Sequence, residues 1–69
     1  MVKFVIKEVR KARGITQAKL AERIGSTQRN VSNWENGICE PDIATLYLIA
    51  EVLEVEMKEL FLLEKKEGA

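Results

Sequence analysis

The fold is decided by one stretch of the chain, QAKLAERIGSTQRNVSNWENG (residues 17–37). Gly25 divides this stretch into two segments, and in each segment apolar side chains recur at the spacing of one helix face. These apolar side chains are Leu20, Ala21, Ile24, Val31 and Trp34. The spacing predicts two short helices, over residues 17–24 and 28–35, joined by a tight turn.

The ends of both predicted helices carry residues that are typical of helix boundaries. Thr16 precedes the first helix and Ser26 or Thr27 precedes the second; a side-chain oxygen there accepts a hydrogen bond from the first turn. Gly25 ends the first helix, and residues 36–37 (Asn-Gly) end the second, because both residue types tolerate the left-handed backbone conformation. Local sequence therefore defines where each helix starts and stops.

Two short helices that cross steeply through a three- or four-residue turn containing glycine form a helix-turn-helix. The turn predicted here spans residues 25–27, and the motif as a whole covers about residues 17–36. Ala21 lies where the two helices approach, and a larger side chain there would push them apart. The first turn of the second helix, beginning with Gln28 and Arg29, then remains exposed to solvent.

The N-terminal segment fits two periodicities. Alternation of Val2, Phe4 and Ile6 indicates a strand, but helical spacing also fits the segment, and no turn residue occurs before Gly14. We therefore predict a helix over residues 3–13, ended by that glycine.

Downstream of the motif the sequence predicts two more helices. Asp42 is typical of a helix N-cap, and helical spacing continues over residues 43–53. The apolar stripe of this helix is Ile43, Leu46, Ile49, Ala50 and Leu53. A short fifth helix is predicted over residues 56–62, and we expect the charged tail, residues 64–69, to fray. The predicted fold is an all-α, five-helix domain over residues 1–63.

The chain has no net charge, but its charges are distributed unevenly. Residues 1–37 contain eight basic and three acidic residues, a balance of +5, and residues 38–69 contain three basic and eight acidic residues, a balance of −5. Such asymmetry between halves indicates a nucleic-acid-binding face on the basic side. The acidic half would then face away from the phosphates.

Other classes of protein are disfavoured by composition. The single cysteine, Cys39, cannot form an intramolecular disulfide and fits a reducing compartment, so we expect a cytoplasmic protein. A lone loop thiol is either incidental or a redox sensor. The sequence contains no histidine, no cluster of metal ligands, no glycine-rich phosphate loop and no membrane-length apolar run. We therefore expect no enzyme activity, cofactor, metal, small-molecule ligand or membrane association.

The segment RGITQAKLAERIG (residues 13–25) resembles the first two helices of the phage repressor/Cro (Xre-type) family. The run VSNWENG (residues 31–37) is similar to the end of that family's recognition helix, and later segments up to residues 60–61 resemble its last two helices. The resemblance covers roughly residues 5–61. It implies a sequence-specific double-stranded-DNA-binding transcriptional regulator, a repressor, that reads the major groove with residues 28–35.

The resemblance also implies roles for individual side chains. The residues that match base-reading positions are Gln28, Arg29 and Asn33, and Ser32 is a further base-reading candidate. Gln17 and Asn36 match phosphate-contacting positions, and the further candidates for phosphate contacts are Arg13, Thr27 and Asn30. Side-chain chemistry favours these roles, because arginine pairs bidentately with guanine and glutamine with adenine, while helix N-termini attract phosphate. The alternative is that these side chains form an ordinary solvated helix face.

A further group of residues is expected to have a structural role. Its members are Arg10, Glu35, Ala21, Gly25 and Trp34. Arg10 and Glu35 match an ion pair between the first and third helices, although Arg10 is also suited to phosphate. Trp34 is expected in the core because it follows Val31 on the apolar face, the alternative being stacking on a base. Ser26 departs from the family pattern, which has a small apolar residue in the turn.

The C-terminal apolar run exceeds what a minimal five-helix core needs. We expect Leu60 and Phe61 to pack inward and Leu62 or Leu63 to remain outside, with Phe4 as an accessory contact. The candidate homodimer interface is therefore Phe61, Leu62 and Leu63, because exposed apolar patches often mark partners. The alternative is loose packing of the terminal segments onto the core.

A dimer would read a near-palindromic operator with two copies of the recognition helix. A second class of function stays open. The same fold serves as a protein-interaction module, for example a coactivator or an antitoxin subunit, in which DNA contact is secondary. The exposed recognition-helix face favours DNA, whereas the acidic second half leaves room for a protein partner.

Overall fold

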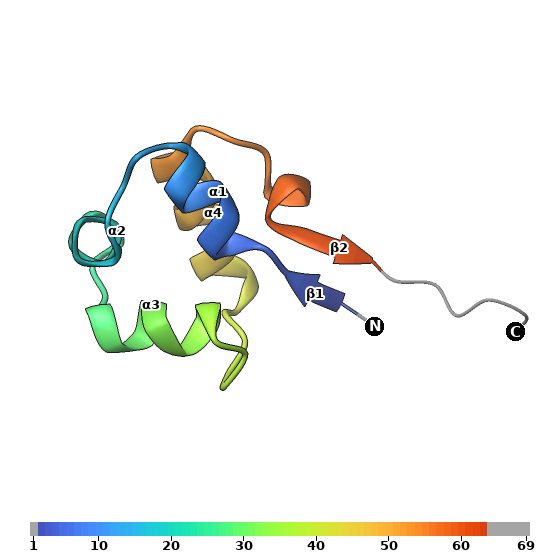
Figure 1. The fold of residues 1–69 in the computed structure, drawn as a ribbon, viewed down its shortest axis with the longest axis horizontal. Helices are drawn as coiled ribbons and strands as arrows, with labels where there is room; N and C mark the ends of the chain where they lie inside the picture. The colour runs from blue at the N-terminus through green and yellow to red at the C-terminus, as the bar shows by residue number, and fades with distance from the viewer. Residues whose placement is uncertain (1, 64–69) are drawn as a thin grey trace, which may run out of the picture.

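The computed structural model describes residues 2–63, which contain four α-helices, one 3₁₀ helix and a small antiparallel sheet (Figure 1). In chain order the elements are β1 (Val2–Phe4), α1 (Ile6–Ala12), α2 (Gln17–Ile24), α3 (Gln28–Glu35), α4 (Ile43–Leu53), η1 (Met57–Leu60) and β2 (Phe61–Leu63). The helices cluster together, and the two strands lie side by side at one end of them (Figure 1). The predicted fraying of the tail falls outside the described residues.

The predicted boundaries of α2, α3 and α4 agree with the structure because their caps are local. Thr16, Thr27 and Asp42 each accept a hydrogen bond from the backbone N–H three positions later, at 3.1, 3.1 and 2.8 Å. Gly25 closes α2 in the left-handed conformation with a φ of 73°. Caps of this kind stabilise a helix end by about 1 kcal/mol each.

The core is formed by apolar side chains from every α-helix and from η1. Its buried members are Ile6, Leu20, Ala21, Val31, Leu46, Ile49, Ala50, Leu53 and Leu60. One predicted core position is wrong. Ile43 is 75% exposed, because it is the first residue of α4 and lies at the edge of the apolar stripe, not at its centre.

The two terminal segments depart from the all-α, five-helix prediction. The helix predicted over residues 3–13 begins only at Ile6, and β1 precedes it. The helix predicted over residues 56–62 is instead one turn of 3₁₀ helix followed by β2. The two strands pair with the register Val2↔Leu63, Lys3↔Leu62 and Phe4↔Phe61. Strand pairing between the two ends of a domain is non-local, so a local periodicity does not reveal it.

Backbone and side-chain contacts anchor this sheet to the helical core. The N–H of Val5 donates to the carbonyl oxygen of Leu60 at 2.8 Å, and Leu60 itself is fully buried. The rings of Phe4 and Phe61 meet edge to face with centroids 6.3 Å apart, a favourable aromatic geometry. The sheet therefore fixes both ends of the domain at one place.

No helix within residues 2–63 has the length and apolar character that crossing a membrane requires.

Candidate nucleic-acid interface

The motif predicted from residues 17–37 is formed by α2 and α3, which cross steeply. Figure 1 shows α2 almost end-on and α3 lying across the view. Ala21 and Val31 are buried at this junction, and the N–H of Ser26 in the turn donates to the carbonyl oxygen of Ala21 at 2.9 Å. The burial of Ala21 is consistent with the predicted close approach of the two helices, which stays a prediction.

The outward side of α3 carries the polar residues that were predicted to contact DNA. Gln28, Arg29 and Asn30 are exposed in its first turn, whereas Ser32 and Asn33 are half-buried one turn later. No acidic residue of the described chain pairs with the guanidinium of Arg29 within 4.0 Å. Arg29 therefore presents its donors to solvent at the N-terminal end of an exposed helix.

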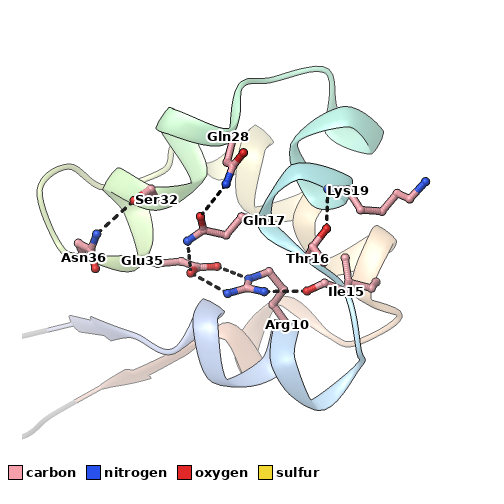
Figure 2. A network of polar contacts seen from close by, with 9 residues as sticks. All are labelled: Arg10, Ile15, Thr16, Gln17, Lys19, Gln28, Ser32, Glu35 and Asn36. Carbon is pink, nitrogen blue, oxygen red and sulfur yellow. Dashed lines mark hydrogen bonds and ion pairs between the residues drawn. The ribbon is translucent and has the colours of Figure 1, made fainter.

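A buried ion pair connects α1 to the end of α3 (Figure 2). Arg10 Nε donates to Glu35 Oε2 at 2.6 Å, and Arg10 Nη2 donates to Glu35 Oε1 at 3.1 Å. The Arg10 and Glu35 side chains are only 8% and 1% exposed. A third donor, Nη1, bonds the carbonyl oxygen of Ile15 at 2.7 Å. Arg10 is thus engaged inside the protein in the pair expected from the sequence, not presented to phosphate.

The polar network continues from this ion pair to the surface of the motif. Gln17 Nε2 donates to Glu35 Oε1 at 2.9 Å, and Gln28 Nε2 donates to Gln17 Oε1 at 3.4 Å (Figure 2). The exposed Gln28 is therefore oriented by α2 and, through Gln17, by the buried carboxylate. Sequence reasoning missed this connection, because residues on separate helices show no mutual periodicity.

Electrostatics keep the carboxylate of Glu35 ionised. Burial raises its pKa, but hydrogen bonds from Arg10 and Gln17, with the positive charges of Arg10 and Lys7, lower it by more. The pKa of Glu35 therefore lies below its usual value of 4.5. The anion remains available as an acceptor for both Arg10 and Gln17 near neutral pH.

Two asparagines flank the exposed face of α3 and bond to nearby serines. Asn30 Nδ2 donates to Ser26 Oγ at 3.0 Å, and Asn36 Nδ2 donates to Ser32 Oγ at 3.2 Å. The serine that departs from the family pattern, Ser26, thus links the turn to the first turn of α3. Thr27, also predicted to contact phosphate, uses its side-chain oxygen to cap α3.

Arg13 lies at the far end of α1 and differs from the other predicted phosphate contacts. Its Nη2 atom is 3.1 Å from Glu54 Oε1, and both side chains are well exposed. An exposed ion pair is worth at most about 1 kcal/mol, so a phosphate can compete with Glu54 for the guanidinium. Trp34, by contrast, is half-buried and packs against the core, as the sequence predicted.

Comparison with known proteins agrees with this geometry. A helix-turn-helix family model matches residues 6–60. A Methanothermobacter thermautotrophicus protein described as an uncharacterised HTH-type transcriptional regulator is 34% identical over 65 residues, which is 93% of this chain and 94% of that protein.

Two solved structures have the same fold. A Bacteroides fragilis protein aligns with a TM-score of 0.86 and 29% identity, over 90% of this chain and all of that one. The P22 c2 repressor, solved in complex with a synthetic operator, aligns with a TM-score of 0.71 and 28% identity, over 77% of this chain and 80% of the repressor chain.

The fold and the exposed face of α3 define a helix-turn-helix DNA-binding domain. The chain belongs to the Xre-type helix-turn-helix family of DNA-binding transcriptional regulators.

Proposed function

We propose that this protein is a repressor that places the first turn of α3 in the major groove of duplex DNA and reads bases with Gln28 and Arg29. The observation that carries this proposal is the exposure of both side chains at the capped N-terminal end of α3. Residues near the N-terminus of a recognition helix are those that reach base edges. Ser32 and Asn33 follow one turn further along the same groove-facing side.

The contacts of Gln28 within the protein suit a base-reading role. Its bond to Gln17 uses one amide hydrogen and leaves the second hydrogen and the carbonyl oxygen for a base. A side chain that is held in place before binding loses less conformational entropy when it docks. The network from Glu35 through Gln17 therefore supports a specific glutamine–adenine pairing.

Phosphate contacts would hold this helix in register along the groove. Candidates for these contacts are Arg13, Gln17, Thr27, Asn30 and Asn36. Gln17 lies at the N-terminal end of α2, where free backbone N–H groups attract a phosphate. Arg13 contributes only after its exposed pair with Glu54 is exchanged for phosphate.

The regulator would act in the cytoplasm as a homodimer on a near-palindromic operator. One recognition helix spans only a few base pairs, which is too little sequence to select a single site in a genome. Two copies related by a two-fold axis double the number of base contacts. The exposed apolar residues of the C-terminal segment support this assembly and are considered below.

A binding measurement with matched arginine variants tests the proposal. Wild-type protein should shift random-sequence duplex DNA at low salt, and added salt should weaken the complex steeply. Arg29→Ala should bind a selected site more weakly, whereas Arg23→Ala, at an exposed position on α2, should bind nearly as the wild type does. Absence of duplex binding at low salt would overturn the proposal and favour a protein-interaction module of the same fold.

A further inference from the structure

The terminal sheet has a strand whose exposed side chains are all apolar. Among the residues that the structure describes, the sheet consists of β1 and β2 alone. In β2, Leu62 is 54% exposed and Leu63 is 68% exposed, although neighbouring strand residues point to opposite faces of a sheet. Packing against one face would therefore cover one leucine and leave the other in water.

The hydrogen bonds within the sheet show which backbone groups point outward. The backbone N–H of Val5 donates to the carbonyl oxygen of Leu60, so these two residues form a hydrogen-bonded pair. In an antiparallel sheet, hydrogen-bonded pairs alternate with non-hydrogen-bonded pairs. The next hydrogen-bonded pair is therefore Lys3↔Leu62. The N–H and C=O groups of Phe61 and Leu63 consequently point to the outer edge of β2. That edge offers two donors and two acceptors in a row.

We propose that the β2 strands of two copies pair antiparallel across a two-fold axis and form a continuous four-stranded sheet. Centring the axis on Leu62 sets Phe61 of one copy opposite Leu63 of the second copy. Both of these residues point their polar groups outward, so the register forms four backbone hydrogen bonds between the copies. Centring the axis on either other residue of β2 would engage only one bonded pair within the strand.

This register also covers both exposed leucines. Leu62 would face its own counterpart across the axis, in a non-bonded pair whose side chains lie close together. On the opposite face, Leu63 would lie beside Phe61 of the second copy. That face continues into an apolar hollow of about 240 Å³, so the dimer would extend an apolar layer that already exists. The hollow is lined by Val2, Phe4, Pro41, Ile43, Leu46 and Phe61.

The edge of β1 is less suited to a second strand. Lys3 lies in the middle of β1, and a lysine on an edge strand discourages pairing with another chain. A hollow of about 320 Å³ lies beside β1 and is walled by Trp34 and by the loop after α3. The pairing is therefore assigned to β2, whose three residues carry no charge.

Disulfide trapping tests the register directly. In a Cys39→Ser background, Leu62→Cys should form a covalent dimer on mild oxidation without DNA, because the two cysteines would face each other at about 4.5 Å between Cα atoms. Leu63→Cys is the matched control. It should not form a covalent dimer, because the Cα atoms of the two cysteines would lie more than about 7 Å apart. Equal trapping of both variants, or none of either, would overturn the register.

A second pair of variants tests the backbone hydrogen bonds. Leu63→Pro and Leu63→Ala both remove the leucine, but only proline also removes the outward N–H. Sedimentation should show a dimer dissociation constant roughly ten- to a hundredfold higher for proline than for alanine, as expected for two lost hydrogen bonds per dimer. Equal dissociation constants for the two variants would overturn the strand pairing. Thermal unfolding is the control and should show that both variants fold.

The strand pairing rests on the proposed function only because a symmetric operator requires a two-fold dimer. Experiments can refute the strand pairing and the proposed function separately. A trapped Leu62→Cys dimer that binds no duplex DNA would support the pairing and refute the proposed function. A protein that selects a near-palindromic operator but yields no trapped dimer would support the proposed function and refute the pairing.

Discussion

The side chain of Glu35 is almost inaccessible to water, yet its carboxylate accepts hydrogen bonds from two different helices. A buried ion pair adds little net stability compared with apolar residues of the same shape, but removing one partner typically costs about 3–5 kcal/mol. The main effect of the ion pair is therefore to fix how the helices are arranged. It fixes the end of α3 against α1 and places Gln17 where Gln28 can bond to it.

Protonation of Glu35 at low pH should destabilise the fold. Because the pKa of folded Glu35 is lowered below 4.5, its charge contributes stability above that pH, and the contribution is lost as pH falls through the folded value. We expect Glu35→Gln to unfold at a lower temperature than the wild type near pH 7. Between about pH 5 and pH 3, the unfolding temperature of this variant should fall less than that of the wild type. Thermal unfolding followed by circular dichroism checks this, and parallel curves for both proteins would contradict it.

Arg29 should discriminate between bases instead of raising affinity for all DNA. We expect Arg29→Ala to cost about 1–3 kcal/mol on the preferred site and to relax selection at one base pair of each half-site. Competition between the preferred site and its single-base variants measures this. An equal loss on every sequence would show that Arg29 contacts only phosphate.

Among the helices, Ala21 is the small side chain that we predict sets how closely α2 and α3 cross. Ala21 is buried, and overpacking of a buried position typically costs about 1–3 kcal/mol. We expect Ala21→Leu to lower the free energy of unfolding by that amount, whereas Ala18→Leu, at an exposed position of the same helix, should change it little. Denaturant unfolding measures both. Equal stability of the two variants would show that Ala21 is not a close contact.

The helix bounds could be predicted from local sequence, whereas the strand pairing could not. The bounds of α2, α3 and α4 follow from caps and periodicity, which act within one helical turn, and these bounds agree with the structure. The strands depend on pairing between opposite ends of the domain, so the alternation of Val2, Phe4 and Ile6, which fits a helix as well, does not identify β1 by itself. The link from Gln17 to Gln28 likewise depends on how two helices cross, which spacing along one chain does not specify.

In the fold as a whole, the first turn of α3 and the terminal sheet lie at different places, and only the C-terminal end of α3 borders β1 (Figure 1). The sheet is built from β1 and β2, whereas the residues proposed to read bases lie on α3. A dimer formed through β2 would therefore leave both copies of α3 uncovered. The exposed acidic residues Glu51, Glu54 and Glu59 lie on α4, its C-cap and η1 instead of on the recognition helix.

Charge in the C-terminal leucines should separate dimerisation from folding. We expect the double substitution Leu62→Glu and Leu63→Glu to yield a monomer at micromolar concentration, because four like charges would meet across one two-fold axis. Both positions are well exposed in one copy, so the thermal unfolding of the monomer should change little. Sedimentation velocity decides this, and a dimer that is indifferent to both charges would place the interface elsewhere.

Selection of bound sites from a pool of random duplex DNA would show whether α3 reads bases in a two-fold operator. The wild type should enrich a near-palindrome whose half-sites lie about 34 Å, one helical turn, apart. Arg29→Ala, selected in parallel, should enrich the same spacing with one base pair per half-site relaxed. No enriched sequence, or a sequence unaffected by the Arg29 substitution, would contradict the claim.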